Sequence, residues 1–181
     1  MKNKKAAVYP GSFNPVHPGH LHVIMQAAQV FDEVVVLIAD NPGKTYTVSY
    51  IKRAEFIRRF LTGFPWFSKV RIEYTNGSLV DYCEKNEIEF VVRGLRNGTD
   101  LEYEKTQYEY NMTLAVEKCP ALTYVYFTTP VTANHLSSSA VKQFMKYATL
   151  DQFILLYQEA GWLYATNEKS YMQEIMEAYN A

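Results

Sequence analysis

Two histidines stand three residues apart in the stretch YPGSFNPVHPGH, which runs from Tyr9 to His20 between an apolar run and a helical pattern. Gly11 lets a ligand approach the backbone closely, and Pro18 suits the first turn of the helix that follows. Free N–H groups and the positive end of the helix dipole favour an anion at such a helix start. Taken alone, a turn rich in proline and glycine is most simply a turn. The chemistry that it could support is phosphate binding.

A second stretch, VVRGLRNGTDLEYE, ends an apolar run and opens a helical one. Its arginines, Arg93 and Arg96, are permanently charged and can bind phosphate oxygens bidentately. We expect Thr99 or Asp100 to cap the helix. A solvated basic loop is the simpler explanation of this stretch by itself. At the carboxyl edge of a parallel sheet, beside the first turn, the same arginines would face phosphates.

A third stretch, LSSSAVK from Leu136 to Lys142, places three serines at the start of a helical pattern. Serine hydroxyls and free backbone N–H groups at a helix start can cap the helix, and they can equally bind phosphate. Simple capping explains this stretch as well as phosphate binding does. The three stretches together favour a site for phosphorylated ligands.

The hydrophobic pattern indicates the scaffold that would bring these stretches together. Five short runs rich in β-branched and aromatic residues predict strands at 6–9, 34–39, 70–74, 89–92 and 122–127. Segments with helical spacing lie between them, and further helices are expected from about 137, over 151–159 and over 168–179. We therefore predict an α/β fold, a Rossmann-like, doubly wound, parallel five-stranded sheet with a helical C-terminal extension. Ligands bind such sheets at the carboxyl ends of the strands.

Composition limits the classes of protein that the chain could be. A net charge of −1 over 181 residues gives no electrostatic footprint for nucleic acid, so no nucleic-acid partner is expected. The longest apolar run, Val34 to Ala39, is far too short to span a membrane. The start MKNKK resembles the first part of a signal peptide, but AAVY is too short for the apolar part that would follow. Cys83 and Cys119 lack the spacing of a disulfide scaffold, and we expect a cytoplasmic protein with both cysteines buried.

The segment HPGH, residues 17–20, resembles the HxGH signature of the nucleotidyltransferase superfamily. RGLR followed by DLEYE resembles the pantetheine-phosphate adenylyltransferase family of that superfamily. LSSSAVK is similar to the ISSSxVR/K segment of the same family, NPGK to its NPxK, and GSLVDY to its GLLVD[FY]. The resemblance runs from about residue 6 to residue 150. It implies a nucleotidyltransferase domain over 1–160, with 161–181 as a helical extension of the same domain.

Members of this family join the phosphate of 4′-phosphopantetheine to the α-phosphate of ATP, which gives dephospho-coenzyme A and pyrophosphate in coenzyme A biosynthesis. The resemblance implies the same two substrates here. Mg²⁺ would be carried largely by the nucleotide phosphates. His17 and His20 have a spacing found in metal sites, but no acidic or thiol partner stands nearby, so no protein metal site is expected. The family also implies a homo-oligomer, a hexamer.

The resemblance implies roles for individual residues as well. The catalytic residues would be His20, Lys44 and Arg96. The residues that bind 4′-phosphopantetheine would be Ser12, Lys44, Leu79 and Arg93. The residues that bind ATP would be Ser12, Phe13, His17, His20, Gly94, Leu95, Arg96, Glu104, Ala133, Asn134, His135, Leu136, Ser137, Ser138 and Ser139.

The chain departs from the usual pattern of the family in several places. Asn14 stands where an aspartate is common, Lys52-Arg53 where a glutamate–arginine pair is usual, and Ala133 where an aromatic residue is common. Nicotinamide-nucleotide adenylyltransferases share GSFNPxHxGH and are the first alternative, although RGLR with DLEYE favours the pantetheine-phosphate family. A noncatalytic nucleotide-sensing module is the second alternative, and the intact histidine and arginine motifs argue against it. No GxGxxG follows the first strand, which argues against a dinucleotide-dependent oxidoreductase.

Overall fold

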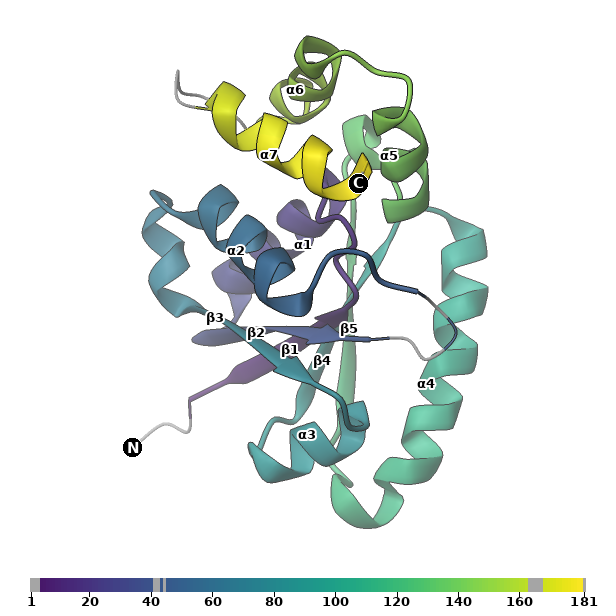
Figure 1. Cartoon of the computed structure of the whole chain (residues 1–181). Coiled ribbons are helices and arrows are strands. Elements are labelled where there is room, and N and C mark those ends of the chain that lie inside the picture. Colours follow the sequence, from purple (N-terminus) through teal and green to yellow (C-terminus); the bar gives the residue numbers. More distant parts are fainter. Residues whose placement is uncertain (1–3, 41–42, 44, 163–167, 181) are drawn as a thin grey trace.

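A computed structural model describes residues 4–40, 43, 45–162 and 168–180 of the chain. Its five strands are all parallel and lie in the order β3-β2-β1-β4-β5 (Figure 1). Their bounds are Ala6–Gly11 for β1, Glu33–Ala39 for β2, Val70–Thr75 for β3, Phe90–Leu95 for β4 and Thr123–Thr128 for β5. The predicted doubly wound parallel sheet is therefore confirmed. Its strand order reverses between β1 and β4, and ligands bind such sheets in the crevice at this point.

The helices alternate with the strands as far as β5 and then follow one another. Their bounds are Pro18–Val30 (α1), Tyr50–Leu61 (α2), Leu79–Lys85 (α3), Gly98–Lys118 (α4), Ser138–Met145 (α5), Leu150–Glu159 (α6) and Glu168–Asn180 (α7), with 3₁₀ turns at Pro65–Lys69 and Val131–Ala133. Pro18 opens α1, as predicted, because its missing N–H costs nothing there. Among the described helices, none combines the length and the apolar character needed to cross a membrane.

The start of α4 differs from the prediction that Thr99 or Asp100 caps this helix. The helix begins at Gly98, and the Asn97 side chain caps it by accepting a hydrogen bond from the Asp100 N–H at 3.0 Å. Asparagine and aspartate cap helices equally well, so the local pattern could not separate them. The prediction of two buried cysteines is also half wrong, since Cys83 is buried and Cys119 is only partly so.

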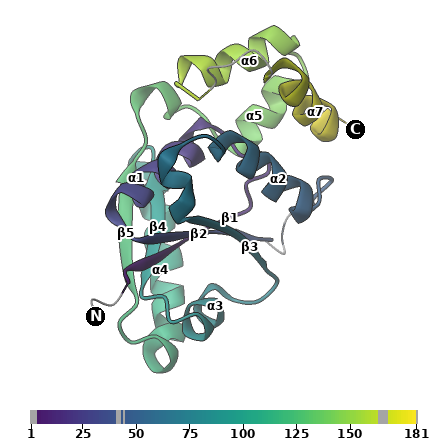
Figure 2. The ribbon, with the colours of Figure 1, turned by 90° about the vertical axis from the view of Figure 1, so that its left-hand side faces the viewer.

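Alternate residues of the central strands face opposite layers of helices. Ala7 and Tyr9 of β1 pack in one buried cluster with α1, α2 and the C-terminal helices. Val8 between them packs in a second cluster with α3 and α4, and the residues of β2 from Val34 to Ile38 alternate in the same way. Figure 2 shows the two layers on either side of the sheet. Because both faces are covered, the strands read as almost continuously apolar in the sequence.

Helix α7 lies across α2 at the end of the molecule where the C-terminal helices gather (Figure 1). Met172 and Ile175 of α7 are fully buried, and the Tyr171 hydroxyl donates to the Phe56 carbonyl of α2 at 2.5 Å. The Glu174 carboxylate forms ion pairs with two cations of α2. The described part of the C-terminal extension thus shares an apolar core and polar contacts with the helical layer of the sheet.

Candidate active site

A cavity of ≈ 760 Å³ opens at the carboxyl ends of β1 and β4. Helix α4 supplies one wall, and the ends of β1 and β4, the turns that follow β1, β4 and β5, and the first residues of α1 and α5 supply most of the rest. The predicted site residues that line the cavity are Ser12, His17, His20, Arg93, Gly94, Arg96, Glu104, Ser137, Ser138 and Ser139. The sheet therefore brings together all three stretches whose composition indicated phosphate binding.

The loop from Gly11 to His17, called the signature loop below, is held by donors from three helices. The donors and the loop carbonyls that accept from them are Arg53 of α2 and Ser12 (2.5 Å), Ser138 of α5 and Pro15 (2.9 Å), and Tyr157 of α6 and Val16 (2.7 Å). Within the loop, Phe13 has a φ of 47°, a left-handed conformation that is unfavourable for a bulky side chain. Such a conformation persists where the surroundings over-determine it, which the three external donors and the burial of Phe13 do here.

The two signature histidines lie with their ring centroids 3.7 Å apart. The backbone N–H of His17 donates to Nδ1 of His20 at 3.3 Å. Because Nδ1 accepts this bond, the proton of the neutral His20 ring is on Nε2. Burial, with added repulsion from the charges of Arg96 and Arg93, lowers the pKa of His20 to about 3. Near pH 7 the ring is thus an uncharged donor.

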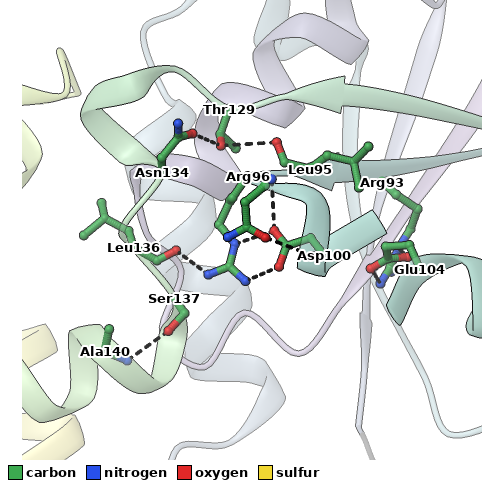
Figure 3. A network of polar contacts seen from close by, with 11 residues as sticks. Arg93, Leu95, Arg96, Asp100, Glu104, Thr129, Asn134, Leu136, Ser137 and Ala140 are labelled. Atoms are coloured by element: carbon green, nitrogen blue, oxygen red, sulfur yellow. Dashed lines mark hydrogen bonds and ion pairs between the residues drawn. The ribbon is translucent and has the colours of Figure 1, made fainter. Parts of the chain in front are cut away.

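Two carboxylates of α4 orient the arginines at the end of β4 (Figure 3). Glu104 accepts from Nε and Nη2 of Arg93, each at 2.6 Å. Asp100 accepts from Nε and Nη2 of Arg96, at 2.7 Å and 2.6 Å. Among the described residues, the other hydrogen-bond partner of each guanidinium is a backbone carbonyl, which accepts from Nη1. It is the Pro10 carbonyl for Arg93 and the Leu136 carbonyl for Arg96. Since a guanidinium has five N–H donors, each arginine keeps two for a ligand.

The segment between β5 and α5 is fixed to the same wall. Nη1 of Arg96 donates to the Leu136 carbonyl at 3.1 Å, and the Thr129 hydroxyl shares a hydrogen bond of 2.8 Å with the Asn134 side-chain amide (Figure 3). Ser137 accepts from the Ala140 N–H and so caps α5, as its position predicted. The start of α5 therefore contacts the signature loop through Ser138, and its serines line the cavity.

Other predicted site residues among the described ones do not line the cavity. They are Phe13, Leu79, Leu95, Ala133, Asn134, His135 and Leu136. The Phe13 ring packs edge-on against His20 with a centroid distance of 5.0 Å, and Leu136 contributes its carbonyl as described above. Lys44, predicted to be catalytic and to bind substrate, lies outside the residues that the structure describes.

Several residues at the site were not singled out from the sequence. Tyr103 and Gln107 line the cavity, and they stand three and seven residues after Asp100, so helical spacing could have placed them on the same face. Asp40 lines the cavity at the end of β2. Arg53 lies behind it with a side chain that is 1% exposed. The sequence marked Arg53 only as part of the Lys52-Arg53 departure and did not indicate its burial, because a cation in an amphipathic helix usually lies at the surface.

The fold and the cavity define a class of α/β protein with a parallel sheet and a site suited to phosphorylated ligands at the carboxyl ends of its strands. The family model described as Cytidylyltransferase-like matches residues 8–144. Over 141 residues the chain is 39% identical to a protein of Dictyoglomus turgidum named phosphopantetheine adenylyltransferase; this covers 78% of the chain and 84% of that protein. The chain belongs to the phosphopantetheine adenylyltransferase family, within the cytidylyltransferase-like superfamily.

Two solved structures of adenylyltransferases have the same fold. The nicotinic acid mononucleotide adenylyltransferase of Plasmodium falciparum, complexed with NaAD, has a TM-score of 0.64 at 16% identity and covers 87% of the chain and 94% of its own. The bifunctional NMN adenylyltransferase/ADP ribose pyrophosphatase of Francisella tularensis, complexed with AMP and a manganese ion, has a TM-score of 0.64 at 17% identity and covers 98% of the chain and 51% of its own. At such identities the likeness concerns the fold.

Proposed function

We propose that the protein transfers the adenylyl group of ATP to 4′-phosphopantetheine, with dephospho-coenzyme A and pyrophosphate as products. The observation that supports this most is the meeting of the HxGH turn, the RGLR arginines and the serine helix start around one cavity. The names of the curated relatives support the choice of acceptor. The reaction would take place in the cytoplasm as a step of coenzyme A biosynthesis.

The chemistry requires no general base, because the attacking group is a phosphate oxygen that is already an anion. The protein has to hold two mutually repelling phosphates in line and to stabilise charge on the α-phosphate. His20 would donate from Nε2 to an α-phosphate oxygen. Arg93 and Arg96 would add permanent positive charge, each through the donors left free by its carboxylate partner.

We assign the two substrates to opposite parts of the sheet. ATP would lie over the ends of β4 and β5, against Arg96 and the serines of α5. The acceptor phosphate would lie toward Ser12 and Lys44, and the pantetheine arm toward Leu79 at the start of α3. Arg93 would bind between the two. In this assignment the strand order β2-β1-β4 sets the direction in which the phosphates approach each other.

The donor set of the cavity fits a divalent cation that arrives on the nucleotide. Its carboxylates are engaged: Glu104 and Asp100 bind arginines of β4 and its following turn, and Asp40 binds Arg53. Among the described residues, no group of three acidic, cysteine or histidine side chains could hold a metal ion. We propose Mg²⁺ in this role, where it would neutralise phosphate charge.

A homo-oligomer, with the hexamer implied by the family resemblance, is part of the proposal. The long helix α4 supports it, because large apolar side chains along this helix are exposed in the single chain. They are Leu101, Tyr103, Tyr108, Tyr110, Leu114 and Val116. An unpartnered apolar surface of this kind is typical of association between subunits.

The test is pyrophosphate release from ATP and Mg²⁺ with 4′-phosphopantetheine or nicotinamide mononucleotide as the sole acceptor, with the product identified by mass. We expect release only with 4′-phosphopantetheine. Release only with the mononucleotide would replace the proposed acceptor and favour the alternative enzyme. If neither acceptor led to pyrophosphate release, the proposed catalysis would be refuted and a nucleotide-sensing module would be favoured.

A further inference from the structure

The side chain of Arg53 is the largest fully buried one among the described residues, and it carries a permanent charge. Arg53 does not line the cavity, but it donates to two residues that do, Ser12 and Asp40. Nη1 donates to the Ser12 carbonyl at 2.5 Å, Nη2 to Asp40 Oδ1 at 2.6 Å, and Nε to the Val48 carbonyl at 3.1 Å. The guanidinium also lies over the Tyr46 ring, 4.5 Å from its centroid.

Burying a guanidinium is costly, so this arrangement calls for a reason beyond packing. Asp40 offers one, because its carboxylate lies on the wall of a cavity otherwise suited to anions. An unpaired carboxylate there would repel a phosphate. The ion pair with Arg53 compensates this charge from behind the wall.

Ser12 offers the second reason. Its carbonyl oxygen carries partial negative charge, and the bond from Arg53 turns this oxygen toward α2. Since a trans peptide is planar, the following N–H, that of Phe13, points the opposite way. The positive φ of Phe13 requires this peptide to be held in place. Arg53 thus controls two oxygen groups that would weaken binding of an anion.

We propose that Arg53 is a positioning residue for the acceptor phosphate. It acts by neutralising Asp40 and by holding the Ser12 peptide in the orientation that presents N–H rather than C=O to the ligand. The sheet indicates which substrate is affected. Gly11 pairs with Ile38, so Ser12 and Asp40 leave the sheet side by side, on the side of β1 away from β4. Arg96, against which ATP is placed, follows β4 on the other side of β1.

This inference rests on the proposed function, and its test measures binding directly. Isothermal titration calorimetry would give the dissociation constants of 4′-phosphopantetheine and of ATP–Mg²⁺ for the unchanged chain and for Arg53→Met. We expect binding of 4′-phosphopantetheine to weaken by about tenfold, the equivalent of one or two lost polar interactions. Binding of ATP–Mg²⁺ should change much less.

The decisive variant is the double substitution Arg53→Met with Asp40→Asn. If Arg53 acts by neutralising Asp40, removing the carboxylate charge restores part of the lost affinity for 4′-phosphopantetheine. A role confined to stability predicts no such recovery. If the Arg53→Met variant fails to fold, Arg53→Lys takes its place in the binding measurement. Its ammonium group keeps the positive charge but cannot make the three directed hydrogen bonds of the guanidinium. We expect it to bind the acceptor more weakly than the unchanged chain does.

Arg59→Met is the matched control. Arg59 stands in the same helix, pairs with Glu55 and Glu174 and lies over the Tyr171 ring at 5.2 Å, but it faces α7. We expect its loss to leave both dissociation constants unchanged. Equal acceptor binding by Arg53→Met and by the unchanged chain, or equal weakening by Arg59→Met, would overturn the inference. Failure of the unchanged chain to bind 4′-phosphopantetheine would instead overturn the proposed function.

Discussion

His20 is an uncharged donor at the edge of a cavity where Arg93 and Arg96 supply positive charge. Its Nδ1 accepts from the backbone of its own signature loop, which leaves Nε2–H as the group that can meet a phosphate. The permanent charges of the arginines can attract both substrates before the reaction. The Nε2–H group of His20 would instead act on one α-phosphate oxygen, where negative charge develops during the transfer. We therefore expect His20 to act in the turnover step more than in binding.

Substituting alanine for His20 should lower kcat by about 10²–10³-fold, the usual cost of losing one donor to a developing charge. The KM values for both substrates should change far less. Steady-state kinetics would check this. His22→Ala is the control, because His22 stands on the same helix but contacts the Ala160 carbonyl and the Trp162 ring. An unchanged turnover number in His20→Ala would remove His20 from the catalytic residues.

The low pKa of His20 also predicts a dependence of stability on pH. The unfolded chain takes up a proton at this residue near pH 6.5, while the folded chain does so only at about pH 3. Between these values the unfolded state binds more protons, so the stability present above pH 6.5 is lost as the pH falls. Urea unfolding at pH 7 and pH 5 should show this decline. In His20→Gln the slope should be smaller by about 1 kcal/mol per pH unit; an equal slope would contradict the buried, neutral state.

At the scale of elements, the contact between β4 and α1 depends on a glycine. A Cβ placed on Gly94 would lie 2.8 Å from Cγ2 of Val23 in α1, which is closer than real side chains approach. Gly94→Ala should therefore cost about 1–3 kcal/mol of unfolding free energy, as overpacking does. It should also weaken ATP binding by moving the wall at Arg96. Replacing Val23 by alanine in the same variant should restore part of the lost unfolding free energy and part of the lost affinity for ATP.

Gly98 provides the control for this substitution. It opens α4, a Cβ placed on it would have no neighbouring atom within 4 Å, and its backbone is not left-handed. Gly98→Ala should leave stability unchanged or raise it by about 0.4–1 kcal/mol, since alanine restricts the unfolded chain. Thermal unfolding of the two variants would compare them. An equal loss in both would show that the contact with Val23 is not the cause.

The elements themselves could be predicted because their signals are local. Short runs rich in β-branched and aromatic residues identified all five strands, and the parallel arrangement followed from the alternation with helices. The three stretches that meet at the cavity could be found because proline, glycine, arginine and serine have restricted or distinctive roles at such positions. Arg53 and Asp40 could not be found, because their roles arise from a pairing between α2 and the end of β2 that only the tertiary structure creates. The predicted cap of α4 was two or three residues too late in the chain, because several good capping residues stand in succession.

At the scale of the whole molecule, we propose that residues 161–181 are part of the same folding unit as the sheet. Ile175 is fully buried in the main core cluster. Ile175→Ala should lower the unfolding free energy by about 2–5 kcal/mol, the usual cost of a cavity, while unfolding stays a single transition. Gln173→Ala, on the exposed side of α7, should have little effect. A separate early transition assigned to α7 would contradict a common folding unit.

The supports of the signature loop also bear on how the protein acquires its activity during synthesis. The hydroxyls of Ser138 and Tyr157 hold the loop, and they leave the ribosome 123 and 141 residues after the carbonyls that they bind. Until those residues emerge, the loop lacks two of its three fixed points. A nascent chain can therefore form the sheet and still have no competent site, and activity should appear abruptly once α6 is released, rather than grow with chain length.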